Sequence, residues 1–343
     1  MKKRVISIGK IKIGADQKIA VQSMVKKNPH DKRAILKEIK ELEEVGCDII
    51  RLAIPDKKAV EIFKDLKKKT STVLVADIHF DFRLALDSID AGADKIRINP
   101  SNLGGEDALK KVLKKAKKAN IPIRVGVNAG SVKDKKISPQ KLVDLCLENV
   151  NILLKENFEN IVVSIKSSKI EETIKSNEAL SKKSPFPIHL GLTEAGPLIS
   201  GTIKSTSALL PLLKKGIGDT IRVSLTSSAK TEVKVAKDIL NVVNKEKNSI
   251  EIISCPTCGR TKNNLEKIAL ELEERLAVFK KPLKVAIMGC EVNGQGEIRE
   301  ADLGIIGGRK ISLFSKGKFI KFIREDEVVG EIEKMISNDT DTL

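Results

Sequence analysis

The sequence predicts a (β/α)8 TIM barrel over residues 1–247, followed by a small α+β domain over residues 248–343. Short β-branched runs alternate eight times with amphipathic helical patterns in the first part, which is close to the roughly 250 residues typical of such barrels. Glycine often closes a helical pattern just before the next strand, as Gly46, Gly92 and Gly218 do. The alternation then stops, and three of the five cysteines follow. A doubly wound open sheet, the main alternative, usually has fewer strands.

Eight runs rich in Val and Ile are the expected barrel strands. They cover residues 19–24, 48–54, 72–78, 95–99, 121–128, 160–166, 188–194 and 219–225. Helical patterns lie between them. In residues 34–45, for example, Ile35, Ile39 and Leu42 fall on one face at helical spacing, which predicts a helix packed against the sheet.

The second domain has a different order of elements. A short strand precedes the Cys255–Cys258 pair, a helix covers residues 264–278, and a second strand ends just before Cys290. Three further apolar runs and a final helix follow, at residues 303–306, 310–314, 318–323 and 327–336. Runs of strands with few helices predict an α+β domain.

Composition excludes some locations and partners. No run of about 18 apolar residues could span a membrane, and the N-terminus lacks the apolar run of a signal peptide, so we expect a cytoplasmic protein without a membrane partner. The net charge of +17 suggests nucleic acid, but the lysines are spread over nearly every expected helix, and Trp and Tyr are absent. We expect solvated helix faces and no nucleic-acid partner, although a basic surface attracts acidic proteins at low salt.

Five expected strands carry a cation within an apolar run, and these are Arg51, Arg97, Arg124, Lys166 and Arg222. Burying one unpaired charge costs several kcal/mol, so five such costs need a common reason. A small-molecule substrate with two phosphate groups supplies it, because guanidinium groups bind phosphate oxygens in pairs. The alternative is that each arginine pairs with a neighbouring carboxylate.

Other polar residues are expected at the same mouth of the barrel, where the carboxyl ends of the strands meet. Asn99 and Ser224 lie two residues after barrel cations and so share their side of the strand, and Lys204 adds a further phosphate contact. Asp77 and Glu194 are strand-end carboxylates and therefore candidates for proton transfer or for orienting substrate hydroxyls.

The cysteines predict a metal centre rather than disulfides, because the cytosol is reducing. Cys47 and Cys146 lie on apolar helical patterns, which predicts simple burial. Zinc needs four ligands, and no histidine follows residue 189. An iron-sulfur cluster held by three cysteines leaves one iron open to substrate. Glu291, Glu297 or water remain as the fourth ligand, with Glu297 at the end of a Gly-rich loop.

Several motifs in one order resemble a known family, the 4-hydroxy-3-methylbut-2-enyl diphosphate synthases, also called IspG or GcpE, in their short bacterial form. The matching segments are 21–24 (VQSM), 75–81 (VADIHFD), 97–100 (RINP), 126–131 (GVNAGS), 192–196 (LTEAG), 216–220 (GIGDT), 255–258 (CPTC) and 289–294 (GCEVNG). The resemblance implies an oxidoreductase of the non-mevalonate isoprenoid pathway. It would open 2-C-methyl-D-erythritol 2,4-cyclodiphosphate reductively to 4-hydroxy-3-methylbut-2-enyl diphosphate, with loss of water.

The resemblance also implies a 4Fe-4S cluster, a homodimer, and ferredoxin or flavodoxin as electron donor. It implies cluster ligands at Cys255, Cys258, Cys290 and Glu297. It implies diphosphate contacts from Arg51, Arg97, Arg124, Lys166, Arg222 and Ser224, with Asn99, Asn128, Asp77 and Glu194 in the same pocket. Gln295 departs from the proline usual in the family, which we expect to loosen the loop before Glu297. A basic nucleic-acid-binding protein and a zinc-dependent hydrolase are the alternatives.

Overall fold

The computed structural model describes residues 3–132, 137–243, 250–279 and 281–338. The chain divides into two compact units, Met1–Lys245 and Glu246–Leu343. The boundary expected between residues 247 and 248 lies outside the described residues. No helix of the described ranges is long and apolar enough to cross a membrane.

The first unit is the predicted barrel of eight parallel strands. The strands are β3 (Ala20–Met24), β4 (Ile49–Ala53), β5 (Val73–Asp77), β6 (Lys95–Ile98), β7 (Ile123–Asn128), β8 (Ile161–Lys166), β9 (His189–Leu190) and β10 (Thr220–Ile221). Their order is β8-β7-β6-β5-β4-β3-β10-β9, and a parallel bridge from Val163 to Ile188 joins the two ends. The predicted TIM barrel is therefore confirmed, with its last two strands shorter than expected.

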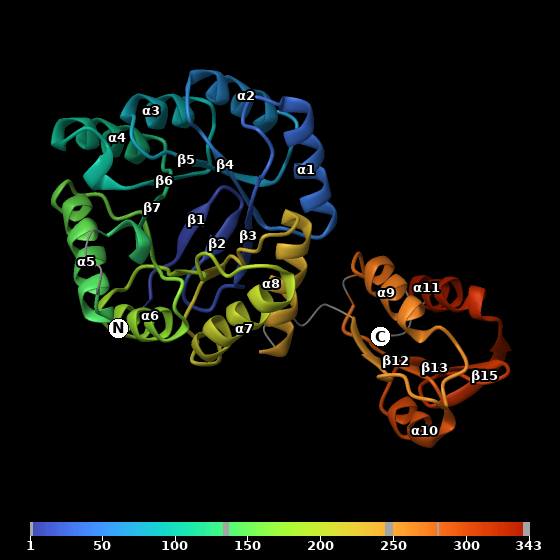
Figure 1. The fold of residues 1–343 in the computed structure, drawn as a ribbon. Coiled ribbons are helices and arrows are strands. Elements are labelled where there is room, and N and C mark those ends of the chain that lie inside the picture. The colour runs from blue at the N-terminus through green and yellow to red at the C-terminus, as the bar shows by residue number, and fades with distance from the viewer. Residues whose placement is uncertain (1–2, 133–136, 244–249, 280, 339–343) are drawn as a thin grey trace. The chain divides into compact units, whose positions relative to one another are not determined.

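Eight helices surround the strands (Figure 1). They are α1 (Lys32–Glu44), α2 (Lys57–Lys67), α3 (Phe82–Asp90), α4 (Glu106–Lys118), α5 (Pro139–Lys155), α6 (Ile170–Lys183), α7 (Leu198–Lys214) and α8 (Ala229–Val242), with 3-10 turns η1 (Pro100–Asn102) and η2 (Ala129–Ser131). Several begin at a side-chain cap; Asp31, Asp56 and Ser228 each accept a hydrogen bond from a backbone N–H of the first turn.

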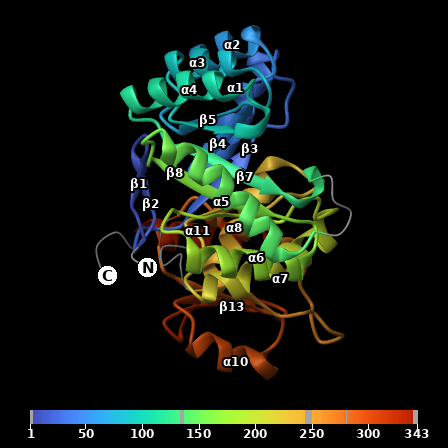
Figure 2. The same ribbon diagram turned by 90° about the vertical axis from the view of Figure 1, so that its left-hand side faces the viewer.

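A short hairpin that we did not predict covers the N-terminal end of the barrel (Figures 1 and 2). Its strands β1 (Ile6–Ile8) and β2 (Ile11–Ile13) pair antiparallel. Ile6, Ile8 and Ile13 are buried together with the strand residues Val73 and Val162. Because this end is covered, a ligand reaches the interior from the carboxyl ends of the strands.

The second unit is a five-stranded sheet with a helix pair on one face and one short helix on the other (Figure 1). Its elements are β11 (Glu251–Ser254), α9 (Leu265–Leu276), β12 (Lys284–Met288), α10 (Glu291–Arg299), β13 (Leu303–Ile306), β14 (Ile311–Ser315), β15 (Lys318–Ile323), η3 (Glu325–Glu327) and α11 (Val328–Asn338). The helices α9 and α11 bury the larger core with Ile311, Leu313 and Ile323, and α10 covers a smaller core.

The segment after Cys290 is helix α10, so the expected Gly-rich loop is wrong. Two glycines weaken a helix by about 1 kcal/mol each relative to alanine, but tertiary packing overrides that preference here. Ile298 is buried, and Gly294 lies so close to Ile306 that an added Cβ would stand 3.0 Å from it. Gln295 lies inside this helix, where a proline would remove one backbone hydrogen-bond donor.

Candidate functional site

Neighbouring barrel strands bring three of the expected site residues into register. Asp77 ends β5 and is paired with Arg97 of β6, and Arg97 is paired with Arg124 of β7. Arg97, Arg124 and Lys166 of β8 are buried, although each is a cation. Arg51 of β4 is largely buried as well. The strand pairing therefore gathers the expected cations around one interior space.

The Asp77 carboxylate forms ion pairs with two of these cations, Arg51 and Arg97. Asp77 Oδ1 lies 3.4 Å from Arg97 Nη1. Asp77 Oδ2 lies 3.8 Å from Arg51 Nε and 3.4 Å from His79 Nε2. Burial alone would raise the pKa of Asp77, but Arg51, the hydrogen bond from His79 and the charges of Arg97 and Arg124 together hold it well below its usual range. Asp77 is thus ionised at neutral pH, and it can orient cations or accept a proton.

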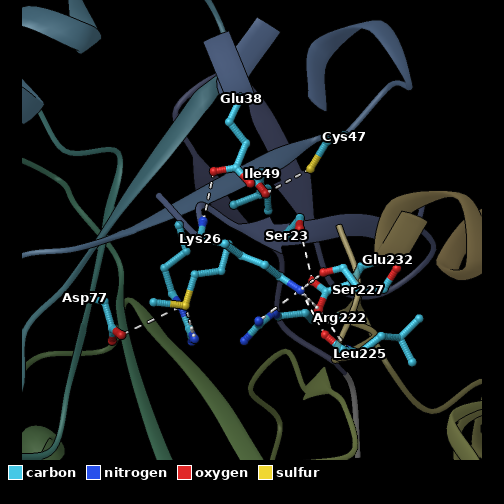
Figure 3. Close-up of polar contacts among 12 residues, drawn as sticks. Ser23, Lys26, Glu38, Cys47, Ile49, Asp77, Arg222, Leu225, Ser227 and Glu232 are labelled. Carbon is cyan, nitrogen blue, oxygen red and sulfur yellow. Dashed lines mark hydrogen bonds and ion pairs between the residues drawn. The ribbon is translucent and has the colours of Figure 1, made fainter. Parts of the chain in front are cut away.

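A second buried carboxylate, Glu232 of α8, was missed in the sequence (Figure 3). It accepts hydrogen bonds from Lys26 Nζ at 2.8 Å and from the backbone N–H of Leu225 at 2.8 Å. It also lies 3.8 Å from Arg222 Nη2. The available signal was its position on the buried stripe of α8, where Ala229, Glu232, Val233 and Ala236 follow helical spacing.

The arrangement leaves positive charge without a counter-ion. Arg51, Arg97 and Arg222 face a carboxylate, as the pairing alternative expected, but within the described residues neither Arg124 nor Lys166 has an ion pair. Nε and Nη1 of Arg124 are buried without a hydrogen-bond partner, and so is Nε of Arg222. Buried donors of this kind require an acceptor, which an anion with several oxygens can provide.

The electrostatics agree with that geometry. Burial, followed by the charges of the neighbouring cations, lowers the pKa of Arg51 to about 10 and holds the pKa values of Arg124 and Lys166 well below their usual ranges. These pKa values all shift in the same direction, because the buried interior of the barrel disfavours further positive charge. A bound polyanion would remove the penalty.

Two further basic residues lie in the barrel interior, and the first of them, Lys95, was also missed. Lys95, the first residue of β6, is fully buried, and its Nζ donates to Gln22 Oε1 at 3.3 Å. His189 is fully buried, and its Nδ1 lies 2.7 Å from Thr220 Oγ1. Burial, reinforced by nearby cations, holds the pKa values of both well below their usual ranges. The alternation of β6, which puts Lys95 on the same side as Arg97, was the available signal.

The remaining barrel candidates lie around the carboxyl ends of the strands. Asn99 follows β6, Asn128 ends β7, and Ser224 follows β10, and all three are half-buried. Lys204 is exposed on α7, and within the described ranges no carboxylate forms an ion pair with it.

Glu194 was expected at the end of a strand, but β9 stops at Leu190. The next residue, Gly191, lies close to its neighbours, and an added Cβ there would meet Lys166 Nζ at 2.7 Å and the Arg222 carbonyl at 2.8 Å. Glu194 is exposed, with the left-handed φ of 47° that is uncommon outside glycine. The turn is held by the buried Ala195 and by a hydrogen bond from Thr226 N–H to the Gly196 carbonyl at 2.9 Å.

The five cysteines fall into two groups. Cys47 and Cys146 are buried in the barrel as predicted, and burial raises both thiol pKa values to about 12. Cys255 follows β11, Cys258 is exposed, and Cys290 caps the N-terminus of α10. The latter three are the candidate metal ligands.

The guanidinium of Arg260 lies near three cysteines, Cys255, Cys258 and Cys290. Its hydrogen bond with Cys290 and its attraction to all three sulfurs raise the pKa of Arg260. The Val292 backbone N–H, and then Arg260, lower the pKa of Cys290 despite partial desolvation. A helix N-terminus and a neighbouring guanidinium are conditions that favour thiolate over thiol.

These residues fit an iron-sulfur cluster better than a single ion. In the described part of the chain no three Cys, His, Asp or Glu side chains are close enough to hold one metal ion. A cluster of several irons spreads its thiolates more widely, and Cys255 and Cys290 follow the carboxyl ends of the neighbouring parallel strands β11 and β12. Glu291 is the first residue of α10. Glu297 lies about 10 Å from Cys290 along the helix axis, and a separation of seven residues brings it close to the same side of the helix as Cys290.

Comparison with known proteins finds the same family for both units. The sequence profile described as the GcpE TIM-barrel domain matches residues 3–237, and that of the GcpE protein C-terminal domain matches residues 251–338. A protein of Caldanaerobacter subterraneus is 50% identical over 98% of both chains, and one of Clostridium perfringens is 48% identical over 97% of both. Both are named 4-hydroxy-3-methylbut-2-en-1-yl diphosphate synthase (flavodoxin).

Two solved structures resemble this chain over about 70% of its length. A dihydropteroate synthase of Yersinia pestis covers 70% of this chain and 100% of its own, with a TM-score of 0.53 and 12% identity. A type I 3-dehydroquinate dehydratase of Clostridium difficile covers 71% of this chain and 97% of its own, with a TM-score of 0.51 and 17% identity. At these identities the likeness shows a shared architecture.

Proposed function

The chain belongs to the GcpE family, and from that premise we propose that it forms 4-hydroxy-3-methylbut-2-en-1-yl diphosphate. The substrate is 2-C-methyl-D-erythritol 2,4-cyclodiphosphate, and the reaction takes up two electrons and two protons, opens the ring and releases water. Family membership argues against the two alternative functions, a nucleic-acid-binding protein and a zinc-dependent hydrolase. The observation that carries the proposal is the set of buried barrel cations without enough counter-charge.

The barrel residues hold and orient the substrate. The diphosphate oxygens bind the unpaired nitrogens of Arg124 and Arg222, with the remaining contacts from Arg51, Arg97, Lys166 and Ser224. Asn99 and Asn128 bind the carbon skeleton's hydroxyl groups, and Lys204 supplies a contact at the mouth. Asp77 and Glu232 keep the guanidinium groups in place, since each carboxylate faces a barrel arginine.

Proton transfer is assigned to carboxylates on this side of the barrel. Glu194 donates a proton to the departing oxygen, and its left-handed backbone supports this role, because such strain is kept where a side chain must be aimed. Asp77 acts with it as an orienting base, because the surrounding cations keep it ionised. The substrate's hydroxyl group leaves as water.

The second unit holds the redox centre. Cys255, Cys258 and Cys290 are ligands of a 4Fe-4S cluster, and Glu297 is the fourth ligand, placed two turns along α10 from Cys290. When bound, such a cluster would supply single electrons to the substrate. Flavodoxin supplies the electrons, as the names of the relatives suggest, with ferredoxin as the alternative. The family resemblance supports a cytoplasmic homodimer.

The proposal is tested on protein purified without oxygen. We expect a brown protein with about four irons and four sulfides per chain that converts the cyclic diphosphate when given reduced methyl viologen. The product is identified by mass spectrometry. A folded, colourless protein that carries zinc, or a cluster-loaded protein that leaves the substrate unchanged, would contradict the proposal.

Anion binding in the barrel should take up protons through Lys166. In the free protein, burial and then Arg124, Arg222, Arg51 and Arg97 hold the pKa of Lys166 below its usual range, so a bound anion raises that pKa, and the amine gains a proton at any pH that lies between the free and the bound pKa. Titration calorimetry with sulfate, which does not itself titrate near neutral pH, measures this uptake as a dependence of the heat on buffer ionisation. Lys166→Met should remove the uptake, whereas Lys204→Met, at an exposed lysine, should retain it. Equal uptake in all three proteins would contradict the role of Lys166.

A further inference from the structure

Lys26 lies at the mouth of the barrel, but it belongs to none of the groups that bind substrate in the proposed function. It follows the carboxyl end of β3 by two residues. Its backbone N–H donates to Glu38 Oε2 at 2.9 Å, and Glu38 is buried on α1 (Figure 3). The Lys26 side chain is 32% exposed. The backbone of Lys26 is therefore anchored to α1, and its side chain extends from a fixed position.

The ammonium group of Lys26 uses all of its hydrogen-bond donors within the protein. Nζ donates to the Leu225 carbonyl at 2.9 Å, to the Ser227 carbonyl at 2.5 Å and to Glu232 Oε1 at 2.8 Å (Figure 3). An ammonium group has three N–H donors and no acceptor. No donor is left for a phosphate oxygen, so any effect of Lys26 on a bound anion must pass through its protein partners.

Glu232 links Lys26 to one of the barrel arginines. It is 2% exposed, and its two carboxylate oxygens have different neighbours. Oε1 accepts hydrogen bonds from Lys26 Nζ and from the Leu225 backbone N–H, both at 2.8 Å. Oε2 accepts one from Ser23 Oγ at 3.4 Å and lies 3.8 Å from Arg222 Nη2. Lys26 and Arg222 therefore share one buried carboxylate.

Lys26 is held more tightly by Glu232 than Arg222 is. The 2.8 Å contact of Lys26 is a charge-assisted hydrogen bond, whereas the 3.8 Å contact of Arg222 is too long for one. Within the described residues, the buried Nε of Arg222 has no hydrogen-bond partner. Without Lys26 the carboxylate would attract Arg222 more strongly, because opposite charges in a buried site are little screened. Glu232 would then compete with an incoming anion for the guanidinium.

We propose that Lys26 is a positioning residue, which engages Glu232 and so keeps Arg222 available for the diphosphate of the substrate. This inference rests on the proposed function, in which Arg222 binds diphosphate oxygens. Lys26 touches no substrate atom, and it acts through one carboxylate on one guanidinium. A binding group is held correctly only when the residues behind it are themselves fixed, as the contacts of Lys26 with the Leu225 and Ser227 carbonyls provide.

Sulfate titration of the full-length, cluster-loaded protein tests the proposal through binding alone. Arg222→Met, which lacks the guanidinium, identifies the heat that belongs to the barrel site. Lys26→Met should weaken sulfate binding there at least about fivefold, because charges in one network are coupled. Lys26→Arg keeps the charge and has enough donors for the three acceptors, so it should bind sulfate within about twofold of the parent. Lys27→Met, which removes the neighbouring exposed lysine, should bind sulfate like the parent.

The action of Lys26 through Glu232 is tested by combining two substitutions. Glu232→Gln keeps the shape and an acceptor oxygen but removes the negative charge. In that background Lys26→Met should weaken sulfate binding by less than about twofold, because no carboxylate is left to compete for Arg222. An equal loss in both backgrounds would overturn the proposal. Parent-like sulfate affinity in Lys26→Met, or an equal loss in Lys27→Met, would overturn it as well.

Turnover distinguishes a positioning role from a structural one. With reduced methyl viologen, Lys26→Met should raise KM for the cyclic diphosphate at least about fivefold and change kcat by less than about twofold, since it weakens binding of the anion throughout the reaction. A lower kcat with an unchanged KM would overturn the positioning role, because Lys26 would then support folding or the cluster. A parent enzyme that leaves the cyclic diphosphate unchanged would contradict the proposed function, whereas the role of Lys26 would still be decided by the sulfate titration.

Discussion

Cys258→Ala is expected to abolish turnover with any reductant while the barrel still binds anions. Cys258 is exposed and contributes to no core, so its removal should not disturb folding. Loss of one thiolate leaves two cysteines and a carboxylate, which should lower the iron and sulfide content well below that of the parent. Iron and sulfide assays, the visible absorption spectrum and sulfate calorimetry measure the three expectations.

Cys146→Ala is the matched control for that prediction. Cys146 is fully buried in the barrel, and burial raises its thiol pKa to about 12, so it remains a neutral thiol that binds no metal. Its replacement should cost about 1 kcal/mol of unfolding free energy and leave the iron content unchanged. Normal iron in Cys258→Ala, or lost iron in a folded Cys146→Ala protein, would contradict the assignment of the ligands.

Periodicity made most of the fold predictable from the sequence. The eight barrel strands and the helices between them recur with the apolar spacing that burial requires. The hairpin of β1 and β2 was missed because three residues are too few to establish an alternation. The helix α10 was missed because its two glycines indicate a loop, whereas its stability comes from contacts with Ile306 and the strands beneath.

The barrel cations were predictable for a different reason. A charge within a run of Val and Ile is costly, so Arg97, Arg124 and Lys166 stood out before their positions were known. Their partners did not stand out, because the sharing of Asp77 depends on which strands are neighbours. Glu232 was harder to predict, because a glutamate on an amphipathic helix usually faces solvent.

Replacement of the buried Arg124 should have two opposite effects, a gain in stability and a loss of activity. Arg124 is 3% exposed, two of its side-chain nitrogens lack hydrogen-bond partners, and burial and the charges of Arg51 and Arg97 lower its pKa. Arg124→Met removes the repulsion and the unmet donors and keeps a side chain of similar length. We expect the free energy of unfolding to rise by about 1–3 kcal/mol, as when other buried charges are replaced by apolar groups.

The activity of Arg124→Met should fall while its stability rises. Each charge-assisted hydrogen bond to a phosphate oxygen contributes about 1.5–3 kcal/mol, so loss of two such bonds should lower kcat/KM by at least about a hundredfold. Arg33→Met, which removes an exposed arginine of α1, should change neither quantity. Denaturant unfolding and steady-state kinetics with methyl viologen measure the two effects. A destabilised but active Arg124→Met protein would mean that Arg124 stabilises the barrel and does not bind the substrate. A gain in stability together with a loss of activity is expected because the barrel cations are held in place for an anion that only the substrate supplies.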